Sequence, residues 1–194
     1  KKIFFSYYKI YIDKVSDICN EVGININTVP NLDVRRINSH KIVTKRSFSS
    51  KASIVSKLGK ICIKYYEKNK IASVIKHIPG HGMSKSDSHF SKPVINVKKK
   101  ELIKKDFRPF KDCKSMFAMT AHVIYQKFDS INVATHSPVI IKDIIRGHIK
   151  FNGILISDDL CMKALKYDLK ENALRALSAG CNLVLHCNGN LKEM

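Results

Sequence analysis

Two kinds of apolar pattern divide the chain. In the first, apolar residues recur every three or four positions, which is the spacing of one face of an α-helix. In the second, a short uninterrupted apolar run is typical of a strand that is buried on both faces of a sheet. Helical spacing occurs in residues 8–22, 50–67 and 162–179. Apolar runs occur in residues 24–29, 71–75, 116–123, 153–157 and 182–186.

Three further segments have weaker patterns. Residues 31–49 are polar and show no period, so we expect them to be irregular. Residues 102–113 are weakly helical or irregular, because Pro109 interrupts them. Ser137-Pro138 predicts the start of a helix that continues to Ile145, since proline is favoured at the first helical position.

Strands and helices therefore alternate along the chain. This alternation predicts βαβ units, a parallel sheet and the α/β fold class. A doubly wound sheet and a closed barrel both satisfy the pattern. The chain has neither a G-x-G-x-x-G nor a G-x-x-x-x-G-K-[ST] sequence, which weakens the nucleotide-binding version of the sheet.

The charge of the chain is strongly positive, with 35 Lys and Arg against 16 Asp and Glu, a net charge of +19. Such a surface attracts polyanions, so a basic nucleic-acid-binding module is one hypothesis. The lysines are scattered, however, and accompany an excess of Ile and Asn that a compositional bias would produce on any fold. We favour a basic solvated surface and regard nucleic acid as an unlikely partner.

The cysteines and the apolar runs suggest a compartment. None of the six cysteines forms a C-x-x-C pair, and most lie beside apolar residues, as buried free thiols do. No apolar run reaches the ~18 residues of a membrane-spanning helix, and no signal peptide is visible. We therefore expect reduced thiols, a cytoplasmic location and no membrane partner.

Polar residues gather where the predicted strands end. In a parallel α/β protein the active residues lie at the carboxyl ends of the strands, in the loops that lead to the helices. His122, after the third strand, fits a buried core histidine as well as it fits a site residue. The other candidates follow the first, second and fourth strands: Asp33, Arg46, Lys76, His77, His81, Asp87, His89, Asp158 and Asp159.

Two of these groups have simpler explanations that must be weighed. Asp158 or Asp159 could merely cap the following helix, but adjacent side chains point in different directions, so one of them can be catalytic. His77 and His81 have the spacing of a metal-binding pair on a helix, which Asp87 and His89 would extend. Proline and glycine between the two histidines exclude a helix there. We therefore expect no metal.

Three sequence runs point to a known family. Residues 76–82 read K-H-I-P-G-H-G, residues 87–89 read D-S-H, and residues 156–162 read I-S-D-D-L-C-M. This combination resembles the family 3 glycoside hydrolases, and within them the bacterial cytoplasmic β-N-acetylglucosaminidases (β-hexosaminidases) of peptidoglycan recycling. Further matches follow in family order at residues 30–34, 46–48, 119–122, 134–138 and 179–183.

The resemblance implies a fold larger than this chain. The family domain is a TIM-like (β/α)8 barrel, which takes about 250 residues. With 194 residues and five strand candidates, we expect a partial TIM-like barrel of parallel strands that lacks its N- and C-terminal strands. Residues 1–194 would then be one catalytic barrel domain, an internal fragment of the longer family domain. The missing portion of the barrel, as a separate chain, is one expected partner.

The resemblance also implies an activity. The chain would be a retaining glycoside hydrolase that removes terminal non-reducing β-linked N-acetylglucosamine from peptidoglycan-derived muropeptides. Asp158 matches the nucleophile that forms the glycosyl-enzyme, and His89 with Asp87 matches the acid/base dyad. The alternative is a non-catalytic truncated remnant of such an enzyme. No cofactor is needed, and the residues that match sugar-binding positions are Arg46, Lys76 and His77.

Overall fold

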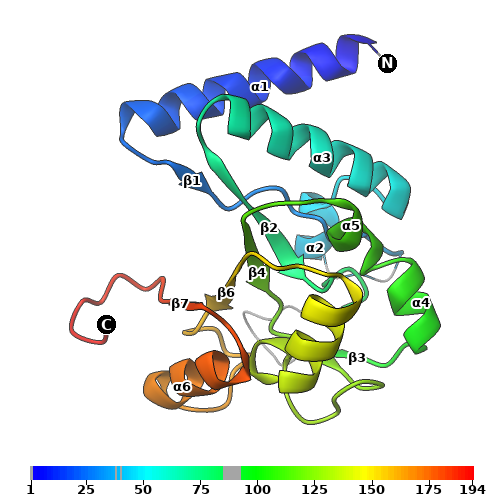
Figure 1. Cartoon of the computed structure of the whole chain (residues 1–194), viewed down its shortest axis with the longest axis vertical. Helices are drawn as coiled ribbons and strands as arrows, with labels where there is room; N and C mark the ends of the chain where they lie inside the picture. Colours follow the sequence, from blue (N-terminus) through cyan, green and yellow to red (C-terminus); the bar gives the residue numbers. More distant parts are fainter. Residues whose placement is uncertain (1, 38, 40, 85–92) are drawn as a thin grey trace.

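The centre of the molecule is a parallel sheet that curves into a half-barrel, with helices along its outer face (Figure 1). The computed structural model describes residues 2–37, 39, 41–84 and 93–194. Every strand pair in the sheet is parallel. In spatial order the strands are β1 (Ile26–Asn27), β2 (Ala72–Ile78), β4 (Phe117–Thr120), β6 (Ile154–Asp159) and β7 (Leu183–Leu185).

The order of the strands decides between the two predicted topologies. Each strand of the sheet pairs with the one that precedes it in this series, so the sheet grows in one direction only. A doubly wound sheet would reverse that direction at a switch point, whereas a barrel does not. The expectation of a partial TIM-like barrel is therefore confirmed. A second parallel pair, β3 (Val94–Ile95) with β5 (Ile124–Tyr125), lies beside the main sheet.

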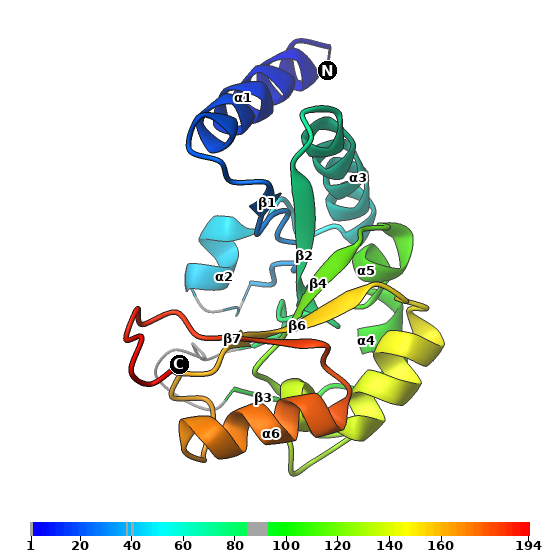
Figure 2. The same cartoon turned by 60° about the vertical axis from the view of Figure 1, so that its left-hand side comes forward.

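The helices cover the outer face of the sheet and form the core with it (Figure 2). α3 (Ala52–Lys68) packs on β2, α6 (Leu169–Ala179) packs on β7, and the π-helix η2 (Ile140–His148) lies between them along the outer face. α1 (Lys2–Glu21) crosses the outer side of α3. Burial of apolar side chains between these layers holds them together. The largest fully buried ones include Leu32, Ile75, Phe107, Phe110, Tyr125 and Ile145.

Most predicted elements are present, with different bounds. The helices expected at 8–22 and 50–67 are α1 and α3. The helix expected from Ser137 is the π-helix η2, and residues 102–113 contribute to α4 (Lys99–Lys104) and α5 (Arg108–Asp112). The apolar run at 116–123 gives β4, and the chain then turns into β5. Apolar runs therefore located the strands but not their ends.

Two predictions of local structure are wrong. Residues 31–49, expected to be irregular, contain the short helix α2 (Lys41–Arg46). The helix expected from residue 162 begins only at Leu169. The Asp168 side chain accepts a hydrogen bond from the backbone N–H of Glu171, which is a capping contact that sets the first turn of α6. Met162 and Ala164, before this cap, are buried in turns instead of on a helix face.

Candidate active site

Asp158 is the carboxylate around which the site is arranged. It belongs to β6 itself, and α6 has its own capping residue, so Asp158 and Asp159 are not helix caps. The Asp158 side chain is 15% exposed, and its Oδ1 accepts the backbone N–H of Asp159 at 2.9 Å. Burial alone would raise the pKa of Asp158, but electrostatic interactions with the His77 and His122 rings, this N–H and Lys76 lower it. Asp158 is therefore ionised at neutral pH.

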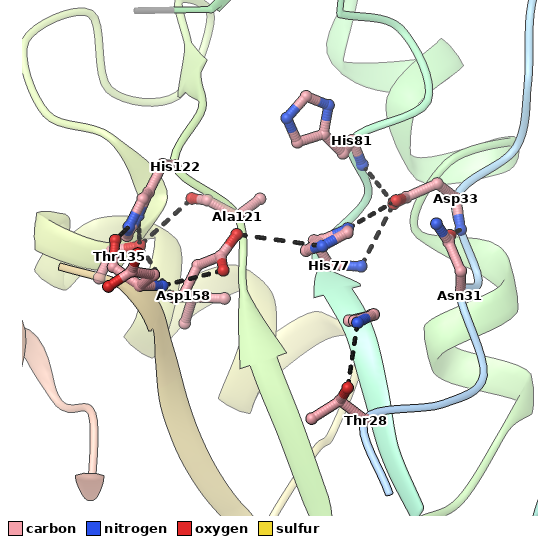
Figure 3. A network of polar contacts seen from close by, with 12 residues as sticks. Thr28, Asn31, Asp33, His77, His81, Ala121, His122, Thr135 and Asp158 are labelled. Atoms are coloured by element: carbon pink, nitrogen blue, oxygen red, sulfur yellow. Dashed lines mark hydrogen bonds and ion pairs between the residues drawn. The ribbon is translucent and has the colours of Figure 1, made fainter. Parts of the chain in front are cut away.

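His77 lies between Asp158 and a second buried carboxylate, Asp33 (Figure 3). It points from β2 toward both groups. Its Nδ1 lies 2.8 Å from Asp33 Oδ2, and its Nε2 lies 3.9 Å from Asp158 Oδ2. Asp33 Oδ1 also accepts the backbone N–H groups of His77 and His81, at 3.3 and 2.7 Å. Asp33 therefore holds His77 by its ring and by its backbone.

The ionisation of Asp33 fixes the direction of the His77 ring. Burial alone would raise the pKa of Asp33, but the charge of His77, its hydrogen bond and the backbone N–H of His81 lower it to about 2. An ionised Asp33 can only accept, so His77 Nδ1 carries a proton and donates it. The other ring nitrogen, Nε2, is left directed at Asp158 and the space beside it.

His122 supports the end of β6 from the opposite side. Its ring is fully buried, with Nδ1 at 2.7 Å from Thr135 Oγ1 and Nε2 at 2.9 Å from the carbonyl oxygen of Asp159. Since a carbonyl oxygen only accepts, His122 Nε2–H is the donor. Burial lowers the pKa of His122, which keeps the ring neutral. The interpretation of His122 as a hydrogen-bonded core histidine is therefore correct, and it fixes the backbone next to Asp158.

Lys76 and Arg46, two of the predicted sugar-binding residues, lie near each other and line one pocket. Lys76 is half-buried on β2 and donates to Thr28 Oγ1 at 3.3 Å, and Arg46 is exposed in the last turn of α2. The pocket that they line has a volume of about 380 Å³. Burial and the charge of Arg46 lower the pKa of Lys76, while the charge of Asp158 raises it. The structure thus brings Arg46, Lys76, His77 and Asp158 into one polar neighbourhood.

The predicted dyad, Asp87 and His89, lies outside the described residues. Gly80 and Gly82, in the described stretch before residue 85, lie against neighbouring backbone. A β-carbon on Gly82 would lie 2.1 Å from the carbonyl oxygen of Val34, and Gly80 has a φ of +141°. Only glycine fits both demands. The glycines of this run therefore fix how the chain packs as it approaches the dyad.

The described residues show no support for a metal centre. Within residues 2–37, 39, 41–84 and 93–194 there is no group of three or more His, Cys, Asp or Glu side chains placed to hold a metal ion. His81 is buried, and burial lowers its pKa. In the same ranges, no helix has the length and apolar character needed to cross a membrane.

Sequence reasoning assigned no role to Asp33, although it lay in the matched run at residues 30–34. Asp33 and His77 are 44 positions apart, and only the pairing of residues 31–33 with β2 brings them together. Its place in the segment that follows a predicted strand made Asp33 a candidate, as the end of a strand did for Asp158. Its partner could not be read from spacing.

Comparison with known proteins identifies the family. Residues 12–194 match the model for the glycosyl hydrolase family 3 N-terminal domain. A β-hexosaminidase of Idiomarina loihiensis is 35% identical over 171 residues, which cover 86% of this chain and 51% of that protein.

Two solved structures have the same fold. A family 3 β-N-acetylglucosaminidase of Paenibacillus sp. FPU-7 superimposes with a TM-score of 0.85 at 29% identity, covering 89% of this chain and 34% of that one. NagZ of Neisseria gonorrhoeae, in complex with N-trifluoroacetyl-D-glucosamine, has a TM-score of 0.83 at 31% identity, covering 94% and 54%. The chain spans about half the length of the curated relatives it matches. It belongs to glycosyl hydrolase family 3, as part of that family's N-terminal domain.

Proposed function

We propose that this chain carries the catalytic centre of a retaining β-N-acetylglucosaminidase. The observation that carries the proposal is the ionised Asp158 carboxylate at the end of β6, facing a histidine held in one orientation. A retaining glycosidase needs such a group to attack the anomeric carbon and form a covalent glycosyl-enzyme. Water then hydrolyses this intermediate, and the configuration of the sugar is retained.

A second group must protonate the leaving oxygen. Many glycosidases use another carboxylic acid for this step. The described carboxylates beside Asp158 do not suit it. Asp33 is fixed by His77 with a pKa of about 2, and Asp159 Oδ1 accepts the backbone N–H groups of Cys161 and Cys187.

We therefore assign the proton transfer to His89, with Asp87 as its hydrogen-bonding partner. A histidine can donate a proton to the departing oxygen and later take one from the attacking water at neutral pH. Asp87 would orient the imidazole and stabilise its charged form, as an aspartate does in a serine protease triad. This arrangement needs no metal and no organic cofactor.

The sugar would be held by groups on the His77 side of Asp158. His77 Nε2, Lys76 and Arg46 are hydrogen-bonding groups that suit the hydroxyls of a sugar ring. They lie on β2 and α2, so a ring placed against them would present its anomeric carbon to β6. The relatives are named for hexosaminidase activity, and one neighbour binds an N-acylated glucosamine. We propose terminal β-linked N-acetylglucosamine of peptidoglycan-derived muropeptides as the substrate, and the cytoplasm as the location.

The active form would include further strands and helices beyond those described. β1 and β7 end the sheet, and each has an apolar pocket beside it, of about 380 and 840 Å³. A strand edge and an apolar pocket together fit an added strand and its helix. We propose that the remainder of the barrel, in the same polypeptide or as a separate chain, docks at both edges. The first pocket includes Lys76 and Arg46, so this docking would also close the sugar site.

The decisive experiment joins this chain to the missing barrel segments of the Idiomarina loihiensis relative and assays a chromogenic β-N-acetylglucosaminide. The completed barrel should hydrolyse it, and a fluorinated N-acetylglucosaminyl donor should label Asp158. Asp143→Asn, an exposed change on η2, is the matched control and should leave both results unchanged. Label on Asp159 would overturn the assignment. A well-folded but inactive barrel without label would identify the chain as a non-catalytic remnant.

A further inference from the structure

Two cysteines lie at the end of the sheet close to Asp158, and the proposed reaction uses neither. Cys161 follows β6 and Cys187 follows β7. Both are exposed, whereas Cys62, Cys113 and Cys181 are buried and Cys19 is half-buried. The two exposed thiols are therefore the ones that a small oxidant reaches most easily.

The pairing of β6 with β7 brings together the two segments that carry the cysteines. Asp159 is in register with Leu185, and the backbone N–H of Leu160 donates to the carbonyl oxygen of Leu185 at 2.9 Å. Each cysteine lies two residues beyond its member of the registered pair. Both strands end before the cysteines, so the hydrogen bonds beyond the ladder decide how close the two residues lie.

A shared hydrogen-bond acceptor keeps the two segments together after the strands end. The backbone N–H groups of Cys161 and Cys187 both donate to Asp159 Oδ1, each at 3.1 Å. Two backbone nitrogens bound to one oxygen cannot be far apart. Disulfides join residues whose Cα atoms are about 4.4–6.8 Å apart, and two nitrogens that each lie 3.1 Å from one oxygen are within twice that distance of each other.

The electrostatics of the two thiols show the same proximity. Burial, the Asp159 carboxylate and its hydrogen bond raise the pKa of Cys161, while the backbone N–H of Cys187 opposes the rise. Burial and the charges of Asp159, Asp158 and Cys161 raise the pKa of Cys187. Each thiol is thus influenced by the other residue and by the same carboxylate.

We propose that Cys161 and Cys187 form a reversible intramolecular disulfide when the protein meets a peroxide, a redox-sensitive modification site beside the nucleophile. One thiolate attacks the peroxide, the O–O bond breaks, and a sulfenic acid forms with loss of one water. The second thiol displaces a second water and forms the S–S bond. The two thiols lose two electrons and two protons in total, and hydrogen peroxide becomes two molecules of water.

The bond would have a structural consequence at this edge. Among the strands that the structure describes, β7 pairs with β6 alone, and the bridge would tie the two covalently. It would also restrain the two loops around the Asp159 carboxylate. The backbone N–H of Asp159 donates to Asp158, so the restraint would lie next to the nucleophile. Amide hydrogens of residues 183–187 should therefore exchange more slowly in the oxidised protein.

The test treats the completed barrel, with any cysteines of the added segments replaced by serine, with hydrogen peroxide, blocks the remaining thiols, and maps the peptides after trypsin cleavage. Lysines and Arg175 between the two cysteines place them on separate peptides. We expect two of the six thiols to be lost, a mass decrease of about 2 Da, one Cys161–Cys187 peptide and full recovery with dithiothreitol. The rate of disulfide formation should rise with pH, because the thiolate is the attacking form and the pKa values of Cys161 and Cys187 are both raised.

Matched variants identify the pair. Cys161→Ser and Cys187→Ser should each abolish the cross-link, while Cys19→Ser should leave it unchanged. The same reaction in urea should give a mixture of pairings, because the register that selects this pair is lost. Linked peptides between other cysteines in the native chain would overturn the proposal. A mass gain on each thiol without a cross-link would overturn it too.

Discussion

The middle of the sheet and its two flanks are built differently. At the carboxyl ends of β2, β4 and β6, polar side chains are buried and bonded to one another, as in the contact of Asp33 with His77 and of His122 with Asp159. At the flanks, apolar side chains face outward. Ile3 and Tyr7 on α1 are 72% and 69% exposed, and Leu183 on β7 is 50% exposed. The polar side chains of the middle are bonded to one another, whereas apolar side chains of the flanks face solvent.

This difference distinguishes the middle, whose contacts this chain makes by itself, from the flanks, whose apolar faces need another segment to cover them. A buried polar network is stable only when every member has a partner, and these members come from three neighbouring strands of the half-barrel. An apolar stripe along an exposed helix is typical of a surface that another segment covers. The positions of the catalytic side chains are therefore set by the middle of the sheet. Substrate access to the site and the stability of the half-barrel depend on the flanks.

The largest expected effect is on the nucleophile at the middle of the sheet. In the completed barrel, Asp158→Asn should lower kcat for an aryl β-N-acetylglucosaminide by about 10⁴-fold or more, because an amide cannot form the glycosyl-enzyme. Azide added as an external nucleophile should restore part of the rate for an activated substrate. A loss smaller than tenfold would show that the reaction does not pass through Asp158.

The second prediction tests His89 as the proton donor. His89→Ala should slow a substrate with a poor leaving group by about 10²–10⁴-fold, since its oxygen needs a proton as it departs. An activated aryl glycoside should be slowed far less. Asp87→Ala should give the same pattern more weakly, because the imidazole remains but loses its orienting partner.

A chelator provides the control for the dyad. If His77, His81, Asp87 and His89 instead bound a metal, all four variants would lose activity alike, whatever the leaving group. A chelator would then abolish the wild-type rate, and zinc would restore it. We expect indifference to the chelator, and sensitivity would contradict the dyad.

The sequence predicts which strands and polar residues form the middle region better than it predicts the contacts between those residues. Apolar runs located β2, β4 and β6, and general topology placed their polar ends together, so Asp158 and His77 could be named. The role of Asp33 could not, because it depends on a long-range pairing between the segment after β1 and β2. The start of α6 was also missed, because the Asp168 cap competes with an apolar period that continues upstream.

The third prediction concerns the role of Asp33. Asp33→Asn should lower kcat by about 10²-fold, the size typical of an orienting partner one step from the reaction. The amide can donate to His77 Nδ1, which would favour the wrong tautomer and turn the remaining N–H toward Asp158. The pH profile should change as well, which a purely structural defect would not cause. Asp143→Asn serves as the control, and an unchanged profile in Asp33→Asn would refute the orienting role.

The fourth prediction follows from the ionisation of Asp33. Its pKa in the folded protein is about 2, against an ordinary value of 3.8. The unfolded chain therefore binds the proton first as the pH falls, so the contribution to stability is present above pH 3.8 and is lost toward pH 2. The loss is roughly 2–3 kcal/mol for this shift. Urea unfolding of the completed barrel at pH 6 and pH 3 should show a smaller difference in Asp33→Asn than in the wild type.

The smallest expected effects lie at the flanks. Because the half-barrel is open at both edges, the isolated chain should be poorly soluble or partly molten, with a broad thermal transition and binding of a hydrophobic dye. A monodisperse monomer with a sharp cooperative transition would contradict this. Joining the missing segments should remove the dye binding.

Single substitutions on α1 refine this picture. Ile3, Tyr7 and Ile18 share one face of the helix and are exposed. If the rest of the barrel covers this face, Tyr7→Lys should weaken its binding as a separate chain by about tenfold, since burying one large apolar side chain contributes roughly 1.5–3 kcal/mol. Ser53→Lys adds the same charge at an exposed position on α3 and should change the affinity little. Equal affinities for Tyr7→Lys and Ser53→Lys, measured by titration calorimetry, would show that the α1 face remains uncovered. The rest of the barrel would then dock only at the open edge of the sheet and not on α1.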